Sequence, residues 1–162
     1  MTPFRTEPRP PDVAAVRALV AATGVFREAE IAIAAELVEE ALARGADASG
    51  YHFLFADDPA GRLLGYACYG PIAGTVHSFD LYWIAVDPAR QGRGLGRRLM
   101  AEVETAIRAA GGRRLYVDTS TSDAYAPTRA FYLRCGHHLA AELPDFYAPG
   151  DGKAVFCKVL PP

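Results

Sequence analysis

The sequence lacks an excess of positive charge and is poor in cysteine. Its 162 residues hold 17 Lys and Arg against 19 Asp and Glu, a formal net charge of -2. Nucleic-acid-binding domains usually carry a basic excess, so this balance argues against a nucleic-acid partner. The three cysteines are an odd number, form no CxxC pair and stand in apolar stretches. They are therefore expected to be buried small hydrophobic residues in a reducing compartment rather than functional thiols.

Long apolar runs are also missing. No stretch approaches the roughly 20 apolar residues of a membrane span, and no signal-peptide pattern is seen, so we expect a cytoplasmic protein without a membrane partner. His137 and His138 have no ligand spacing with other His or Cys, so no metal site is expected. With 51% apolar and 22% charged residues, the composition fits a single globular domain over residues 1–162.

The spacing of apolar residues predicts an alternation of strands and helices. Helices are expected over residues 8–24, about 28–43, about 94–110 and about 126–136, the second with an apolar stripe of Ile31, Ala34, Ala35, Val38 and Leu42. Strands are expected over residues 4–6, 51–56, 62–70, 78–86, 113–119, 137–146 and 153–160, with turns at 57–61 and 149–152. This order predicts an α/β or α+β fold around a mixed sheet.

The stretch VDPARQGRGLGRRLM, from Val86 to Met100, places three alternating glycines between a predicted strand and a predicted helix. Its spacing is not G-x-G-x-x-G, and no Gly-Lys-Ser/Thr occurs, so neither familiar nucleotide loop fits. Unpaired amide groups at the helix start, with Arg93 and Arg97 beside them, still suit a phosphate group. The alternative is that the glycines serve only the geometry of a tight turn.

Two motifs carry a resemblance to a known family. Gln91-Gly92-Arg93-Gly94-Leu95-Gly96 fits Q/R-x-x-G-x-G/A, and YAPTRAFYLRCGH over residues 125–137 is similar to N-x-x-A-x-x-F-Y-x-x-x-G-F. Both resemble signatures of the GNAT superfamily of N-acetyltransferases. The chain departs from the second motif at Tyr125, Thr128 and His137, where Asn, Ala and Phe are usual. The resemblance implies a mixed, mostly antiparallel central sheet of about six to seven strands, flanked by about four helices. It also implies a V-shaped cleft between strands 78–86 and 113–119.

The resemblance further implies an acetyl-CoA-dependent N-acetyltransferase that acts by direct attack of a primary amine, without an acyl-enzyme. In such enzymes the glycine loop holds the pyrophosphate of acetyl-CoA and the preceding strand pairs with its pantetheine arm. The matching positions here are Ile84, Ala85, Val86, Gln91, Gly92, Arg93, Gly94, Leu95, Gly96 and Arg97. The amide of Val86 or of its neighbour is the expected oxyanion donor.

Three residues are candidates for proton transfer. Tyr132 stands at the general-acid position of the resembling family; its alternative role is packing beside Phe131. Asp118 is the first candidate for the general base and Asp80 the second, and either carboxylate could instead cap a neighbouring loop. A water chain without a single base is a further alternative.

The acceptor is expected to be a small amine or the amine of a peptide or protein. Tyr147, Asp145 and Asp151, in the loop from Asp145 to Lys153, could recognise a cationic amine, or the loop could serve turn geometry alone. The second predicted helix and the loop near Phe26, Arg27 and Glu28 are the other expected acceptor wall. Dimers are common in the resembling family, which makes a homodimer a further hypothesis. The alternative function is a non-catalytic acyl-CoA sensor or interaction module.

Overall fold

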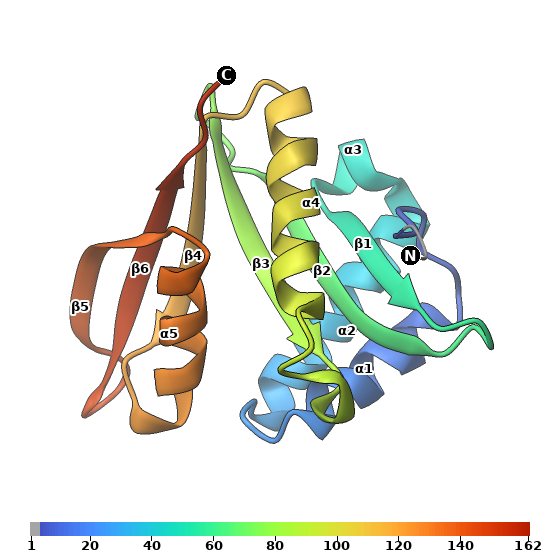
Figure 1. The fold of residues 1–162 in the computed structure, drawn as a ribbon, viewed down its shortest axis with the longest axis horizontal. Helices are drawn as coiled ribbons and strands as arrows, with labels where there is room; N and C mark the ends of the chain where they lie inside the picture. The colour runs from blue at the N-terminus through green and yellow to red at the C-terminus, as the bar shows by residue number, and fades with distance from the viewer. Residues whose placement is uncertain (1–3) are drawn as a thin grey trace. The chain divides into compact units, whose positions relative to one another are not determined.

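The computed structural model describes residues 4–162 and divides the chain into two compact units. The first holds the residues up to Gly70 together with Trp83–Val103, and the second holds Pro71–Tyr82 and Glu104–Pro162. Six strands are hydrogen-bonded in the order β1-β2-β3-β4-β6-β5, and β3 contributes residues to both units (Figure 1). The mixed sheet expected from the sequence is confirmed, while a single domain over residues 1–162 stays a prediction.

From α1 onward, and apart from α3, the elements follow the predicted order. The helices are α1 Asp12–Ala22, α2 Glu28–Arg44, α3 Ala46–Ser49, α4 Leu95–Ala109 and α5 Ala126–Arg134, with short 3-10 turns at Pro88–Arg90 and Asp123–Tyr125. The strands are β1 His52–Asp57, β2 Leu63–Pro71, β3 Ser78–Val86, β4 Arg114–Ser120, β5 His138–Ala148 and β6 Asp151–Val159. The pairs β1/β2, β4/β6 and β5/β6 are antiparallel, whereas β3 and β4 run parallel.

Two predictions for the N-terminal part of the chain were wrong. The expected strand at residues 4–6 is only an isolated bridge between Arg5 and Phe55, because a single residue pairs there. On α2, Leu42 is 37% exposed and Ala41 is buried instead, since residue 41 lies on the same face one turn after Val38.

Two further elements differ from the prediction. The four residues of α3 were not expected, because so short a helix shows no apolar periodicity. The turn between β5 and β6 is shorter than residues 149–152, since β5 reaches Ala148 and β6 starts at Asp151. Gly150 sits there at φ +79, which lets the chain reverse within two residues.

In the first unit, α1 and α2 cover one face of β1 and β2, and the start of α4 lies on the other face (Figure 1). The core between the two helices and the strands includes Val16, Val20, Val38, Phe55 and Tyr66. On the other face Gly65 makes room for α4: a Cβ built on Gly65 would lie 3.3 Å from side-chain atoms of Leu95 and Leu99. The missing side chain of Gly65 therefore lets the first turn of α4 approach β2 closely.

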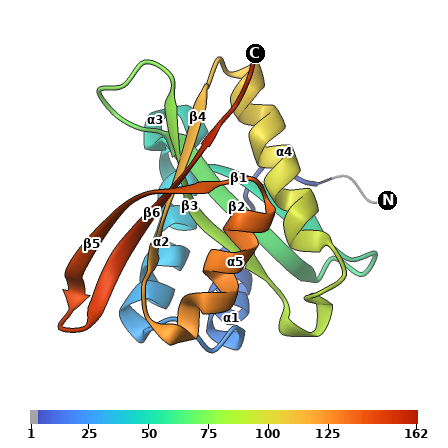
Figure 2. The same cartoon turned by 60° about the vertical axis from the view of Figure 1, so that its left-hand side comes forward.

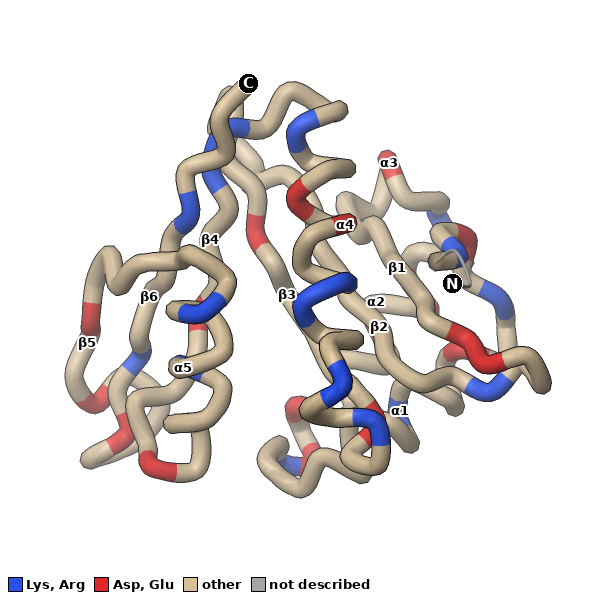
Figure 3. Tube along the Cα trace, viewed as in Figure 1, with Lys and Arg blue, Asp and Glu red and all other residues tan. Residues whose placement is uncertain are grey.

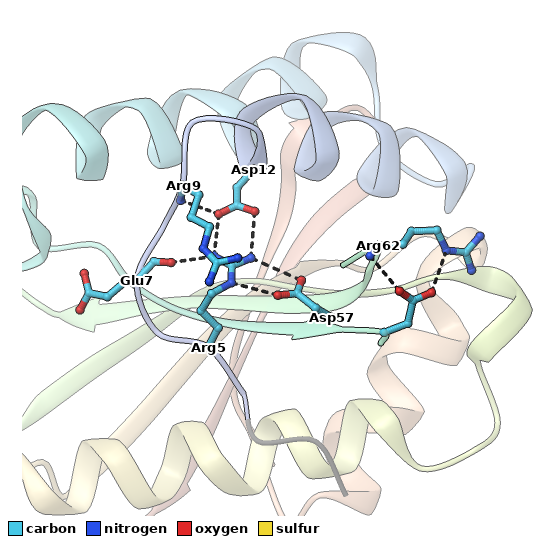
Figure 4. Close-up of polar contacts among 7 residues, drawn as sticks. Arg5, Glu7, Arg9, Asp12, Asp57 and Arg62 are labelled. Carbon is cyan, nitrogen blue, oxygen red and sulfur yellow. Dashed lines mark hydrogen bonds and ion pairs between the residues drawn. The ribbon is translucent and has the colours of Figure 1, made fainter. Parts of the chain in front are cut away.

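An ion-pair cluster fixes the chain start within the first unit (Figure 4). The guanidinium of Arg5 donates to both carboxylate oxygens of Asp12, at 2.8 and 2.9 Å, and its Nε donates to Asp57 at 2.9 Å. The same guanidinium lies 4.4 Å from the centre of the Phe55 ring. Because the pairs are mostly buried and bidentate, they join residue 5 to α1 and β1 more firmly than a surface ion pair would.

In the second unit, β5 and β6 form a long hairpin, which Figure 2 shows plainly. The side chains of β4 alternate between two faces, with Leu115, Val117 and Thr119 buried and Arg114, Tyr116 and Asp118 less covered. On the buried face, α5 packs against β6, where the Tyr132 and Phe156 rings lie 5.8 Å apart. Residues paired across strands share a face. The alternation along β4 therefore decides on which face of the sheet each candidate catalytic residue lies.

Candidate active site

The loop after β3 has the backbone expected of an anion cradle. Gly92 and Gly94 adopt φ +73 and +85, and a Cβ at either would meet no atom within 4 Å. The carbonyl of Gly94 accepts the amide of Arg98 at 3.1 Å, which makes Gly94 the last residue before α4. The following amides lie at the positive end of the helix dipole, without partners in the helix. The loop therefore offers open backbone donors where the sequence predicted them.

The entry to this loop is held by side-chain contacts within the first unit. The Asp87 carboxylate accepts the amide of Ala89 at 2.9 Å and the guanidinium of Arg62 at 3.0 Å. The side-chain amide of Gln91 donates to the carbonyl of Val86 at 3.2 Å. Gln91 is thus tied to the end of β3 and gives the first position of the motif a structural role.

Positive charge is gathered at the same loop. Figure 3 shows basic positions following one another along the loop and into the first turns of α4. Arg93 and Arg97 are exposed. The guanidinium of Arg98 instead lies 5.1 Å from the centre of the Phe4 ring, so it has a structural contact of its own. Arg93 and Arg97 are therefore the better candidates to pair with a bound anion.

Tyr132 lies on α5 in the second unit and is 5% exposed. Its ring contacts the aromatic rings of Phe131, His137 and Phe156, with centres 5.6 to 5.9 Å apart. Burial raises the pKa of its hydroxyl well above the ordinary value, and Cys135 and Tyr125 raise it further. The hydroxyl therefore remains protonated, and able to donate, throughout the neutral range.

His137 stands where the resembling family usually has Phe, and it is buried like one. It is 3% exposed, and neither ring nitrogen has a hydrogen-bond partner among residues 4–162. Burial lowers the pKa of the imidazole to about 4, and the nearby charges of Lys158 and His138 lower it further. At neutral pH the ring is therefore an uncharged packing group beside Tyr132.

Replacing His137 by phenylalanine is expected to make the free energy of unfolding less dependent on pH. The imidazole binds a proton more readily in the unfolded chain, near pKa 6.5, than in the folded protein, near 4. Stability is therefore lost as pH falls through this window, by about 2 kcal/mol between pH 8 and pH 5. Urea unfolding at the two pH values should show this loss in the wild type and not in His137→Phe. The exposed His138→Gln should behave as the wild type, and equal losses in all three proteins would refute the burial of a neutral imidazole.

The two candidate bases lie on the less covered face of the second unit. Asp80 pairs with Tyr116 in the β3–β4 register, and Asp118 follows Tyr116 by two residues, so both carboxylates share one face. Lys153 lies opposite Ser120 on β6, which places its side chain on that face too. Its Nζ lies 2.7 Å from Oδ2 of Asp118. The sequence did not single out Lys153, because the pairing depends on a register that no local pattern reveals.

Asp80 differs from Asp118 in its surroundings. It is half-buried and has no ion-pair partner among the described residues. Burial raises the pKa of its carboxyl, the negative charge of Asp118 raises it further, and Lys153 lowers it. A carboxylate with a raised pKa is a stronger proton acceptor, as proton removal from an amine requires.

Tyr132 and the two aspartates lie on opposite faces of the second unit's strands. Phe156, which the Tyr132 ring contacts, pairs with Val117 on the buried face of β4. Asp118 follows Val117 directly and so points the other way. The Tyr132 ring and the two carboxylates therefore do not face one another.

The loop from Asp145 to Lys153, one of the two expected acceptor walls, contains two aspartates whose carboxylates accept hydrogen bonds. Asp145, at φ +54, accepts the amide of Gly150 at 2.7 Å, and Asp151 accepts the hydroxyl of Ser120. The Asp145 contact agrees with the turn-geometry alternative, whereas the Asp151 contact joins the start of β6 to the end of β4. At the other expected wall, the Phe26 ring packs edge-on against Trp83, with ring centres 4.8 Å apart in the first unit.

Two general features concern the described residues as a whole. Across residues 4–162, no helix is both long and apolar enough to span a bilayer. Within the same range, no three His, Cys, Asp or Glu side chains come together as metal ligands would. None of the three cysteines, which all lie within residues 4–162, forms a disulfide, and Cys68 and Cys157 are buried.

Comparison with known proteins identifies acetyltransferases among the similar sequences. The model of the Acetyltransferase (GNAT) family matches residues 21–137. A blasticidin-S acetyltransferase of Streptomyces morookaense is 44% identical over 81 residues, which cover 50% of this chain and 55% of that protein. An uncharacterized protein of Mycobacterium leprae is 32% identical over 106 residues, 65% of this chain and 28% of that protein. The chain thus matches between about a quarter and about half of the length of these curated relatives.

Solved structures agree in fold. A protein from Desulfovibrio desulfuricans assigned to the GNAT family of acetyltransferases is 46% identical, with a TM-score of 0.93 and 98% of both chains covered. An aminoglycoside 6'-N-acetyltransferase complexed with coenzyme A is 19% identical, with a TM-score of 0.77 over 99% of this chain and 98% of that one. At that identity the second likeness concerns the fold alone.

Proposed function

This chain belongs to the GNAT family of acetyltransferases, and from that premise we propose that it transfers the acetyl group of acetyl-CoA to a primary amine by direct attack. The observation that carries the proposal is the loop before α4. It combines two glycines in the left-handed region, open space where their side chains would stand, and exposed arginines at a helix start. A pyrophosphate group has the charge and shape that such a loop would hold.

The residues proposed to hold acetyl-CoA are those that the motif marks. Gly92 and Gly94 would admit the pyrophosphate oxygens to the backbone amides, and Arg93 and Arg97 would pair with their charge. The end of β3, at Ile84, Ala85 and Val86, would supply backbone groups to the pantetheine arm. Bound there, acetyl-CoA supplies a thioester whose carbonyl carbon is open to a nucleophile.

The chain's own side chains would move two protons. An alkylamine is mostly an ammonium ion at neutral pH, since its pKa is about 10, and it must lose a proton to attack. A carboxylate on the Asp80 and Asp118 face would take that proton. As the new carbon–nitrogen bond forms, the nitrogen releases a second proton to solvent and becomes an amide nitrogen. The carbon–sulfur bond breaks, and its electron pair stays on sulfur. Tyr132 would act as general acid and donate its hydroxyl proton toward that sulfur.

The raised pKa of Tyr132 defines how it would help. A free thiol has a pKa of about 8.5, below that of the buried phenol, so complete proton transfer to the thiolate is uphill. Tyr132 would therefore stabilise the transition state mainly through a hydrogen bond that strengthens as negative charge develops on sulfur. This donor is available over the whole neutral range because burial keeps the hydroxyl protonated.

An acceptor screen tests the proposal. The purified protein, with acetyl-CoA, should release free thiol in step with N-acetylated product, identified by mass spectrometry. Amine-bearing antibiotics should be tried first, because of the similarity to a blasticidin-S acetyltransferase over 81 residues. Small aliphatic amines and peptide amino termini would follow. Acetyl-CoA binding in a calorimeter without thiol release on any amine would instead support a non-catalytic acyl-CoA sensor.

A further inference from the structure

Lys153 distinguishes the two carboxylates of the proposed site. Its Nζ lies 2.7 Å from Oδ2 of Asp118, with exposed side-chain fractions of 20% for Lys153 and 43% for Asp118. No comparable cation contacts Asp80 among the residues that the structure describes. One carboxylate is therefore paired and the other is not, although both lie on the same face of neighbouring strands.

The sheet register explains why Lys153 reaches Asp118. Lys153 lies opposite Ser120, two residues beyond Asp118 on β4. Such diagonal neighbours on an antiparallel pair are about 7 Å apart, within the reach of a lysine. The ammonium also lies 4.6 Å from the centre of the Phe146 ring. The carboxylate and the aromatic ring together hold the ammonium in place.

We infer that Lys153 is a positioning residue of the proposed acceptor site, because its ammonium is bound to Asp118 and leaves Asp80 as the carboxylate that accepts the proton of the amine. The inference rests on the proposed function. One carboxylate oxygen of Asp118 is bound to the Lys153 ammonium, which balances its negative charge. Asp118 is therefore less available than Asp80 to an incoming amine. Asp80 is half-buried and unpaired. The order of the two candidates is thus the reverse of the one the sequence suggested.

The charged and titratable groups of the second unit that share this face with Asp80 come from β3 and from the three strands beside it. They are Tyr82 on β3, Arg114, Tyr116 and Asp118 on β4, Lys153 and Cys157 on β6, and His138 and Tyr147 on β5. The hydrogen bond to Asp118 raises the pKa of Lys153, so the ammonium stays charged through the neutral range. Without this ammonium, the negative charge of Asp118 would act on Asp80 unopposed and would favour its protonated form.

Lys153→Met should therefore change the pH profile of acetyl transfer. A base that holds its proton more tightly is inactive up to a higher pH, so the acidic limb of the kcat/KM profile should move toward alkaline pH. On the acidic limb we expect kcat/KM at a given pH to be about tenfold lower than in the wild type, and at pH 9 to differ less than about twofold. Lys153→Arg keeps a cation beside Asp118 and should keep the wild-type profile.

A double variant separates charge from structure. Asp118→Asn with Lys153→Met removes both charges, so the wild-type profile should return. A merely structural lysine would leave the double variant as impaired as Lys153→Met. An unchanged profile in Lys153→Met, or a double variant that keeps the shift, overturns the inference.

A titration that needs no turnover distinguishes this inference from the proposed function. Carbon-13 NMR of the Asp80 carboxyl, assigned by its loss in Asp80→Asn, should show protonation at higher pH in Lys153→Met than in the wild type. If no amine is acetylated by the wild type, the proposed function falls, and the inference falls with it as a statement about catalysis. If transfer occurs but the carboxyl titrates identically in both proteins, only the inference falls.

Discussion

Replacing Gly94 by valine is expected to lower the affinity for acetyl-CoA by about 100-fold. Gly94 sits at φ +85, where a β-branched residue is strained by about 1–3 kcal/mol. A valine side chain would also stand in the open space before α4, where the pyrophosphate is proposed to meet the backbone amides. Isothermal titration calorimetry with acetyl-CoA measures the effect directly.

Gly61→Val provides the matched control for this prediction. Gly61 lies in the turn between β1 and β2, at φ +83, and a Cβ there likewise meets no atom within 4 Å. Its valine variant should suffer a similar backbone strain and unfold at a similarly lowered denaturant concentration, yet bind acetyl-CoA normally. If Gly94→Val binds as well as Gly61→Val does, the loop does not hold the pyrophosphate.

Replacing Tyr132 by phenylalanine is expected to lower kcat by about 100- to 1000-fold, the range for removing one hydrogen-bond donor to charge that develops in the transition state. Acetyl-CoA affinity should stay within about threefold, because the proposed hydrogen bond forms mainly as the carbon–sulfur bond breaks. The phenylalanine ring keeps the contacts with Phe131, His137 and Phe156, so the fold should persist. Steady-state kinetics with the best acceptor from the screen, beside calorimetry, separates the two quantities.

Tyr66→Phe controls for the loss of a buried hydroxyl as such. Tyr66 is fully buried in the first unit, and its hydroxyl has no hydrogen-bond partner among residues 4–162. Removing that oxygen should leave kcat near the wild-type value and should not destabilise the fold. Turnover of Tyr132→Phe equal to that of Tyr66→Phe would leave Tyr132 with a packing role beside Phe131 and Phe156.

The fold was largely predictable from local patterns. The apolar repeat of Leu99, Val103 and Ile107 predicted α4, and these three side chains are fully buried. Glycines at 92 and 94 predicted the open loop, since only glycine adopts positive φ at low cost. Tertiary context decided the exceptions. Arg5 forms a single bridge with Phe55 instead of a strand, and Ala41 is buried in the core where Leu42 was expected.

The catalytic candidates were only partly predictable. The motif pointed to Tyr132, and the position of Asp118 and Asp80 on neighbouring strands pointed to a base. The motif also marked His137 as a departure, but only the structure shows it buried against the Tyr132 ring without a hydrogen-bond partner. Neither motif reaches Lys153, which is 35 residues from Asp118 in the chain and adjacent to it in space.

By itself, the sequence determined the elements and the loop, because helix and strand periodicity and the φ preference of glycine are local properties. The faces on which the side chains lie, and their partners, were decided only by the tertiary structure. Strand register follows from hydrogen bonding between distant segments, and a shift of one residue would turn every side chain to the other face. That register places Asp118 beside Lys153 and opposite to the Tyr132 face. The glycine loop before α4 could therefore be predicted from the sequence, whereas the pairing of charges around the proposed base could not.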